Sequence, residues 1–309
     1  MFAISFNTFS GNGQRIKLIT AIEPVTFRRK FLCSCKGLVA FRSNFGVFCF
    51  MDSGRIVDIE LPANFLEIRN NCFLANGDCI ERMRLIPSHS IDLIITDPPY
   101  NLGLFMHHRG TNLKKMRENA FAYAGWDNLD FDKWCLMMKQ FLSECSRVLK
   151  KRGSLIVFMS IIKAGKLVEL AEDTKLYYKT TGVWHKTNPM PRNMNLHFIN
   201  STEAWLYFVN ESLTGTFNNS KLAIHDFIET PTISKKEKRI VNHPTQKPIA
   251  LIDHFVRILS NPNDVVLDPF MGSGSTGVSS INLNRKFIGI ELSSSYFKLT
   301  QKRITEDCK

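Results

Sequence analysis

From residue 72 onward, short apolar runs alternate with segments whose apolar residues recur at helical spacing. This alternation predicts an α/β fold in which a parallel sheet is covered by helices on both faces. Buried strands are expected at 73–75 and 91–96, with a helix at 80–85 between them. A longer helix is expected from about residue 132 to 150, ended by Gly153, because one face gathers Trp134, Met138, Phe141, Cys145 and Leu149. Further strands are expected at 154–160, 265–267 and 287–290. Further helices are expected at 249–259, between the Gly-rich turn and about residue 283, and from about residue 294 onward.

Two stretches depart from this pattern. Residues 186–242 are polar and rich in Asn, Thr, Lys and Pro, with one apolar segment at 204–209, and are interpreted as an inserted region. Residues 1–50 show neither the helical period of 3.6 residues nor the strand period of 2. They contain nine of the 24 Phe, and they carry seven Lys or Arg against one acid, which gives a net charge of +6. Because Met51 begins a segment that reads like an ordinary amino terminus, we interpret residues 1–50 as an extension that the fold does not need. The alternative is a basic arm that contacts phosphates.

Composition narrows the class of protein. A chain of 309 residues, 44% hydrophobic, can bury a large α/β core. Its formal charge of +12, from 40 Lys and Arg against 28 Asp and Glu, favours a polyanionic partner. No apolar run approaches the roughly 18 residues of a membrane span, and no signal peptide is evident, so a cytoplasmic protein with no membrane partner is expected. The eight Cys form no CxxC pair, and neither disulfides nor a metal site is predicted.

The first candidate motif is Asp97-Pro98-Pro99-Tyr100, directly after the apolar run IDLIIT. Its side chains should therefore emerge at the carboxyl edge of the sheet, where α/β proteins bind ligands. Successive prolines supply carbonyl acceptors and no N–H donors, so the Asp97 carboxylate and the Pro98 carbonyl suit an amine with two hydrogens. Tyr100 offers an aromatic face for a flipped base. A strand-ending turn with a packed Tyr is the alternative interpretation.

The second motif, Asp268 to Gly277 (DPFMGSGSTG), follows the strand DVVLD and opens a helix. It matches GxGxxG, and Glu291 follows about 20 residues later, as in dinucleotide-binding folds. Only 18 residues follow Glu291. The other half of such a fold would therefore have to precede the motif, which indicates a circularly permuted order.

Together the segments TDPPYNLG, HPTQKPIALIDHF, VVLDPFMGSGSTG and FIGIEL, in this order, resemble the β group of DNA amino-methyltransferases, whose catalytic motif precedes the cofactor motif. The resemblance covers residues 72–309. It implies a single Rossmann-like methyltransferase domain with a mixed, mostly parallel sheet, and residues 186–242 as the target-recognition region.

The resemblance also implies roles for single residues. The catalytic motif is Asp97, Pro98, Pro99 and Tyr100. The S-adenosylmethionine site is formed by Asp268, Phe270, Gly272 and Gly274 in the turn, Glu291 at the ribose, Asp78 at the adenine ring, and Thr245 and Lys247 near the methionine end. For Thr245 and Lys247, a loop that caps the following helix is the alternative.

The implied function is transfer of a methyl group from S-adenosylmethionine to N6 of adenine in a specific double-stranded DNA sequence, as the modification enzyme of a restriction-modification system. Cytosine N4 is the alternative target, and Asp at position 97 favours adenine. A DNA-binding subunit without activity and a nicotinamide oxidoreductase are rivals of other classes. Expected partners are DNA, a second copy of the chain in a homodimer, and a separate restriction endonuclease. Two basic segments are expected to hold DNA: His107, His108, Arg109, Lys114, Lys115 and Arg117, and Lys186, Arg192, Lys221, Lys235, Lys236, Lys238 and Arg239.

Overall fold

The computed structural model describes residues 5–11, 14–20, 61–69, 71–102, 129–189, 195, 198–234, 237, 241, 243 and 245–308. The chain divides into two compact units, Met1–Asp58 and Ile59–Lys309. In the first unit, β1 (Ser5–Gly11) and β2 (Gln14–Thr20) pair antiparallel. The second unit carries all the candidate motifs and is described from here on.

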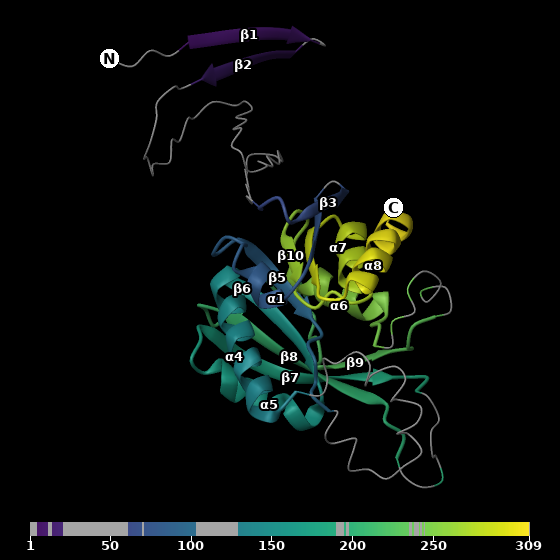
Figure 1. The fold of residues 1–309 in the computed structure, drawn as a ribbon. Helices are drawn as coiled ribbons and strands as arrows, with labels where there is room; N and C mark the ends of the chain where they lie inside the picture. Colours follow the sequence, from purple (N-terminus) through teal and green to yellow (C-terminus); the bar gives the residue numbers. More distant parts are fainter. Residues whose placement is uncertain are drawn as a thin grey trace. The chain divides into compact units, whose positions relative to one another are not determined.

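A nine-stranded sheet forms the centre of the second unit (Figure 1). Its strand order is β3 (Leu66–Arg69), β4 (Cys72–Asn76), β11 (Lys286–Glu291), β10 (Val265–Asp268), β5 (Ile91–Thr96), β6 (Leu149–Met159), β8 (Thr202–Asn210), β7 (Leu176–Lys186) and β9 (Phe227–Thr230). The strands from β4 to β6 in this order run parallel, and β3 and β8 run antiparallel to their neighbours. The expected mixed, mostly parallel sheet is confirmed.

Helices cover both faces of this sheet, as Figure 1 shows. One group is α6 (Ile249–Leu259), α7 (Ser275–Asn282) and α8 (Ser294–Asp307), and the other is α1 (Cys79–Met83), α4 (Phe131–Val148) and α5 (Ile161–Ala171). Successive strand side chains point to opposite faces. Leu93 and Ile95 of β5 therefore join the core with Phe255 of α6. Ile94, between them, is just as buried on the other face. Both faces of the sheet are buried under helices, which explains why the central strands are continuous apolar runs.

The end of α4 differs from the prediction. The helix stops at Val148, and Leu149 is already extended as the first residue of β6. Gly153 is wrong as a helix terminator, because it lies inside β6. There the register shifts against β5, Arg152 has φ +70°, and a Cβ on Gly153 would crowd the Lys150 and Asp92 carbonyls. This glycine relieves an irregular strand, a role with the same sequence signature as a helix cap.

The polar region 186–242 contributes to the sheet. Its apolar segment is β8, which lies between β6 and β7, and its later part supplies the edge strand β9. The inserted region is therefore interrupted by two strands of the main fold, and its role in target recognition stays a prediction. Several elements were not expected from the sequence: strands β1, β2, β3, β7, β8 and β9, and helix α5.

Among the described residues, no helix is long and apolar enough to cross a bilayer. The five cysteines there are unpaired thiols, and four of them are buried. Burial raises the pKa of both Cys72 and Cys79 to about 12. These thiols are packing groups and not nucleophiles.

Candidate active site

The two candidate motifs meet because their strands are neighbours. β10 pairs parallel with β5, with Val266 opposite Leu93 and Leu267 opposite Ile94. Parallel strands end at the same edge, so the residues that follow Thr96 and Leu267 lie side by side. The Thr96 hydroxyl donates to Asp268 Oδ1 over 2.8 Å and so links the two motifs directly.

The Asp97 carboxylate is bound by two donors. The Tyr100 hydroxyl donates to Oδ1 over 2.6 Å, and the Lys247 ammonium donates to Oδ2. Lys247 also lies over the Tyr100 ring, 5.7 Å from its centroid. Burial raises the pKa of Asp97 despite the Lys247 charge, while the carboxylates of Asp97 and Glu203 outweigh burial and raise the pKa of Lys247. Lys247, expected near the methionine end of a cofactor, thus contacts the catalytic motif itself.

Glu203, at the start of β8, is a site residue that the sequence analysis missed. Its Oε2 lies 3.2 Å from Lys247 Nζ and 3.4 Å from the Tyr100 hydroxyl, and its Oε1 binds the ammonium of Lys186. Burial disfavours the charged form of Glu203, but the Lys247 and Lys186 ammoniums prevail and lower its pKa to about 2. A lone acid heading an otherwise buried strand, TEAWLYFVN, was the signal available.

Lys186, predicted as a DNA-binding cation, is paired inside this site and lies 5.0 Å from the Trp184 ring centroid. Lys221 is exposed. The other cations predicted to hold DNA, at 107–117, 192, 235, 236, 238 and 239, lie outside the described residues.

The prolines of the motif are anchored from α4. The Trp134 indole N–H donates to the Pro99 carbonyl over 2.9 Å. That carbonyl is therefore already used by the fold, which leaves the Pro98 carbonyl as the candidate acceptor from the turn. Trp134 is fully buried, so the indole fixes the turn against α4, which packs on β6.

The Gly-rich turn after β10 is built around the buried Asp268. Its Oδ1 accepts from the Phe270 N–H over 3.2 Å, and its Oδ2 accepts from the Thr276 hydroxyl over 2.7 Å. Burial raises the pKa of Asp268 to about 7. Asp268 thus shapes the turn, and the Phe270 ring packs edge to face on Phe141 of α4 at 5.3 Å.

Both glycines of the turn have left-handed backbones, with φ +49° at Gly272 and +77° at Gly274. A Cβ on Gly274 would overlap the Thr300 methyl group, and one on Gly272 would contact the His243 ring. Gly274 is the N-cap of α7. Glycine is therefore required at 274 by both conformation and space.

Glu291, at the end of β11, faces this turn. Its Oε2 accepts from the Gly272 N–H and its Oε1 from the Ser293 N–H, each over 2.8 Å. Burial raises the pKa of Glu291. Asp78 lies after β4, the next strand, and its Oδ1 accepts from the Ile80 and Glu81 N–H groups as the N-cap of α1.

The segment around Thr245 closes the same edge. The Thr245 hydroxyl lies 3.2 Å from His243 Nδ1, and the His243 ring packs on Tyr296 with centroids 4.4 Å apart. Burial, helped by the Lys247 charge, lowers the pKa of His243 to about 4, so the ring is neutral at pH 7. Ser275 Oγ donates to the Lys247 carbonyl over 2.7 Å and ties this segment to α7.

The residues at this edge fit S-adenosylmethionine. The turn at Gly272 has no side chain to fill the space that a Cβ would occupy next to His243. Glu291 supplies carboxylate oxygens, which suit the hydroxyl groups of a ribose. The Gly-rich turn leads into the N-terminus of α7, where backbone N–H groups favour a carboxylate.

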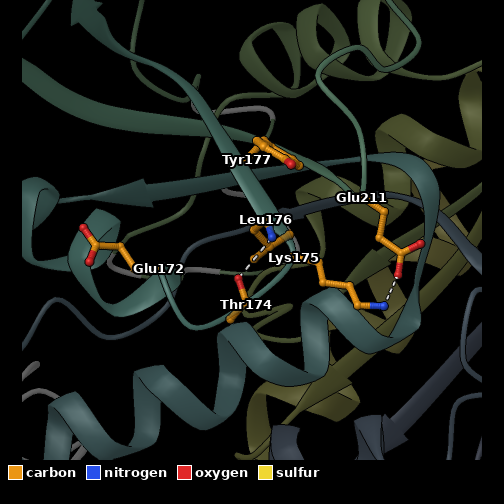
Figure 2. A pocket seen from close by; sticks show the side chains of 6 residues that line it. All are labelled: Glu172, Thr174, Lys175, Leu176, Tyr177 and Glu211. Atoms are coloured by element: carbon orange, nitrogen blue, oxygen red, sulfur yellow. Dashed lines mark hydrogen bonds and ion pairs between the residues drawn. The ribbon is translucent and has the colours of Figure 1, made fainter.

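A surface hollow elsewhere is not part of this site. Figure 2 shows that it is lined by Glu172, Thr174, Lys175, Leu176, Tyr177 and Glu211, with an ion pair between Lys175 and Glu211. Leu176 begins β7, whereas Lys186 ends it beside Glu203. Eleven strand residues separate these ends by roughly 30 Å.

Comparison with known proteins identifies relatives of the chain. A sequence model of a DNA methylase family (N6_N4_Mtase) matches residues 91–302. The chain is 33% identical over 251 residues to the type II methyltransferase M.HinfI of Haemophilus influenzae, covering 75% of this chain and 68% of that protein. It is 30% identical over 265 residues to the DNA adenine methyltransferase YhdJ of Escherichia coli K12, covering 75% and 82%.

Solved structures share the fold. The M1.HpyAVI–SAM complex is 28% identical, with a TM-score of 0.56 over 75% of this chain and 99% of that one. The cytosine-N4-specific PvuII DNA methyltransferase superimposes with a TM-score of 0.59 over 77% and 91% at 19% identity, which is a likeness of fold alone.

Proposed function

The chain belongs to the DNA methylase family whose sequence model it matches, and from that premise we propose that it transfers a methyl group from S-adenosylmethionine to N6 of adenine in double-stranded DNA. The observation that carries the proposal is the Asp97 carboxylate at the end of β5, next to the Gly-rich turn that follows the neighbouring strand β10. An acceptor for an amine is thereby set beside a site for the methyl donor.

Asp97 and the Pro98 carbonyl act on the target amine. Its lone pair is delocalised into the base, so the nitrogen is a poor nucleophile until acceptors on its hydrogens draw it toward tetrahedral geometry. When bound, S-adenosylmethionine would supply a methyl group on a sulfonium: the amine nitrogen would bond to that carbon, the C–S electron pair would stay on sulfur, and the surplus N–H proton would leave to water. The Asp97 carboxylate stabilises the positive charge that develops on nitrogen. Tyr100 stacks on the base after it leaves the duplex.

Residues on three neighbouring strand ends would hold the methyl donor. We assign Glu291 to the ribose hydroxyls, Gly272 and Gly274 to close backbone approach, and Asp78 to the adenine ring. Phe270, Thr245 and Lys247 complete the set, with Lys247 between the donor site and Asp97. Asp268 is fully engaged within the fold through Thr96, Thr276 and Phe270, so we assign it the role of shaping the turn.

Adenine is favoured over cytosine as the target. M.HinfI and YhdJ match the chain at 30% identity or more, and YhdJ is named a DNA adenine methyltransferase. The alternative, cytosine N4, is an amine that the same acceptors could activate. M.HinfI is named a type II methyltransferase, which supports a role in restriction-modification. The proposal includes a cytoplasmic location, a homodimer, and a separate endonuclease that acts on the same site.

Sequencing methylated bases in a host that expresses this gene tests the proposal. We expect N6-methyladenine at one short sequence, and none in a host that expresses the Asp97→Ala variant. N4-methylcytosine in its place would establish the alternative, and no modified base would contradict the proposed activity.

A further inference from the structure

Four charged side chains form an alternating row beside the catalytic motif: Asp97, Lys247, Glu203 and Lys186. Lys247 binds Asp97 and lies 3.2 Å from Glu203, and Lys186 binds the other oxygen of Glu203. The Lys247 side chain is only 8% exposed, and the other three are 18 to 22% exposed. Two carboxylates and two ammoniums balance, as a buried cluster of charges requires.

In this row both oxygens of Asp97 already have partners. Tyr100 binds Oδ1 and Lys247 binds Oδ2. Each oxygen keeps a second lone pair, but the Lys247 ammonium binds Oδ2, so a target amine that donates to this oxygen competes with the ammonium for it. Lys247 is the donor with an alternative acceptor. Its ammonium already lies next to Glu203 Oε2, while Lys186 binds Oε1 of the same carboxylate.

We propose that Glu203 is a positioning residue for methyl transfer, which receives the Lys247 ammonium when the amine of the target base takes its place on Asp97. The inference rests on the proposed function. A buried ammonium needs a carboxylate partner. Without the charge of Glu203, Lys247 stays on Asp97, and the amine is deprived of its acceptor even though the base and the methyl donor are both bound.

Three single variants test this role. Glu203→Gln keeps the shape of the side chain and removes its charge, and Glu203→Asp keeps the charge and shortens the chain. Glu229→Gln is the matched control, because Glu229 is an exposed acid paired with His185 at 2.9 Å on the neighbouring strands. The measurements are the single-turnover rate of methyl transfer to DNA carrying the mapped site, at saturating DNA and S-adenosylmethionine, and the Kd of each.

We expect Glu203→Gln to lower the single-turnover rate by about tenfold or more while both Kd values stay within about twofold. Glu203→Asp should be the faster of the two Glu203 variants, and Glu229→Gln should match the wild type. The reverse order, with Gln faster than Asp, would show that Glu203 acts through packing and would overturn the inference.

Two further outcomes would also decide against it. An unchanged rate in Glu203→Gln with an active wild type would overturn this inference alone. A wild-type protein that binds S-adenosylmethionine but methylates no DNA would overturn the proposed function and this inference with it.

Discussion

The Asp97 carboxylate is the residue on which the proposed chemistry depends most directly. It acts on the amine and not on the methyl donor, so Asp97→Ala should abolish methyl transfer and change the affinity for S-adenosylmethionine by less than about tenfold. Lys247 keeps Glu203 as a partner in this variant, so the fold should persist. Tritiated methyl incorporation and calorimetric titration measure the two effects. Near-normal turnover would remove Asp97 from the catalytic role.

Gly274 gives a prediction about the shape of the cofactor turn. Gly274→Ala should destabilise the protein by about 2–4 kcal/mol and weaken cofactor binding, because φ is +77° and the new methyl group overlaps the Thr300 methyl. Thr300→Ser removes that methyl and keeps the 2.5 Å hydrogen bond from its hydroxyl to the Gly272 carbonyl.

The double variant should therefore recover the steric part of the loss. Gly165→Ala in α5 is the control, since a Cβ there meets nothing within 4 Å and alanine favours the helix. Denaturant titration measures the wild type, the three single variants and the double variant, and equal stability of Gly274→Ala and wild type would refute this account of the turn.

The sequence was informative about the site where residues follow one another in a motif. Asp97, Tyr100, Gly272, Gly274 and Glu291 were all chosen as candidates, and the structure brings them to one edge of the sheet. Glu203 could not be found in this way, because its meaning comes from Lys247, which reaches it across the sheet from another segment. Ion pairs between distant segments leave no spacing to recognise.

Among the elements, β8 gives a prediction about its last residue. The fully buried Asn210 side chain donates to the Ser146 and Leu149 carbonyls, each over 3.0 Å, and accepts from the Ser146 hydroxyl over 3.0 Å. It thereby satisfies carbonyls at the end of α4. Asn210→Ala should lower the free energy of unfolding by about 2–4 kcal/mol, since these buried groups would lose their partner.

Asn219→Ala serves as the comparison, because the hydrogen bonds of that side chain lie at the surface. It should change stability by less than about 0.5 kcal/mol. Chemical denaturation of both variants gives the difference, and equal values would mean that Asn210 does not hold α4.

Strands and helices could be predicted from the sequence where one or both of their faces are completely buried. The runs at 91–96 and 249–259 match β5 and α6 residue for residue, because strands buried on both faces and strongly one-sided helices leave clear patterns. β7 was missed because it has no regular pattern of buried and exposed residues. Leu176 and Trp184 are buried, but Tyr177 and Tyr178 are both exposed. It is a strand because it pairs with β8, and its own sequence does not predict this pairing.

For the whole molecule, we predict that deleting residues 1–50 leaves an active enzyme. The second compact unit begins at Ile59, and the family match begins at residue 91. Deleting residues 1–76 is the control, because it also removes β4, the partner of β11, and should abolish S-adenosylmethionine binding. Loss of cofactor binding in the shorter deletion would show that the extension is structural. Weaker DNA binding with saturated turnover retained would favour a basic arm.

DNA binding by the whole protein is expected to depend on three lysines of the polar region 186–242. Lys235, Lys236 and Lys238 lie outside the described residues, and their contact with phosphates stays a prediction from the sequence. Neutralising all three to Gln should weaken binding to target and non-target duplexes alike and lower the salt slope by about three units. Neutralising Lys139, Lys298 and Lys302 on α4 and α8 is the control. An unchanged slope in the first variant would remove that cluster from the DNA interface.

The strand order has a consequence for the timing of synthesis. β4 and β5 follow each other in the chain, yet two strands lie between them in the sheet, and both of these, β10 and β11, come from the last 45 residues. The sheet therefore cannot be complete between β4 and β5 before residues 265–291 have been synthesised. Asp97 is made early, but its neighbours Asp268 and Gly272 arrive only with those residues. A nascent chain that ends before residue 265 lacks Gly272, Gly274 and Glu291, and we expect it to bind no S-adenosylmethionine.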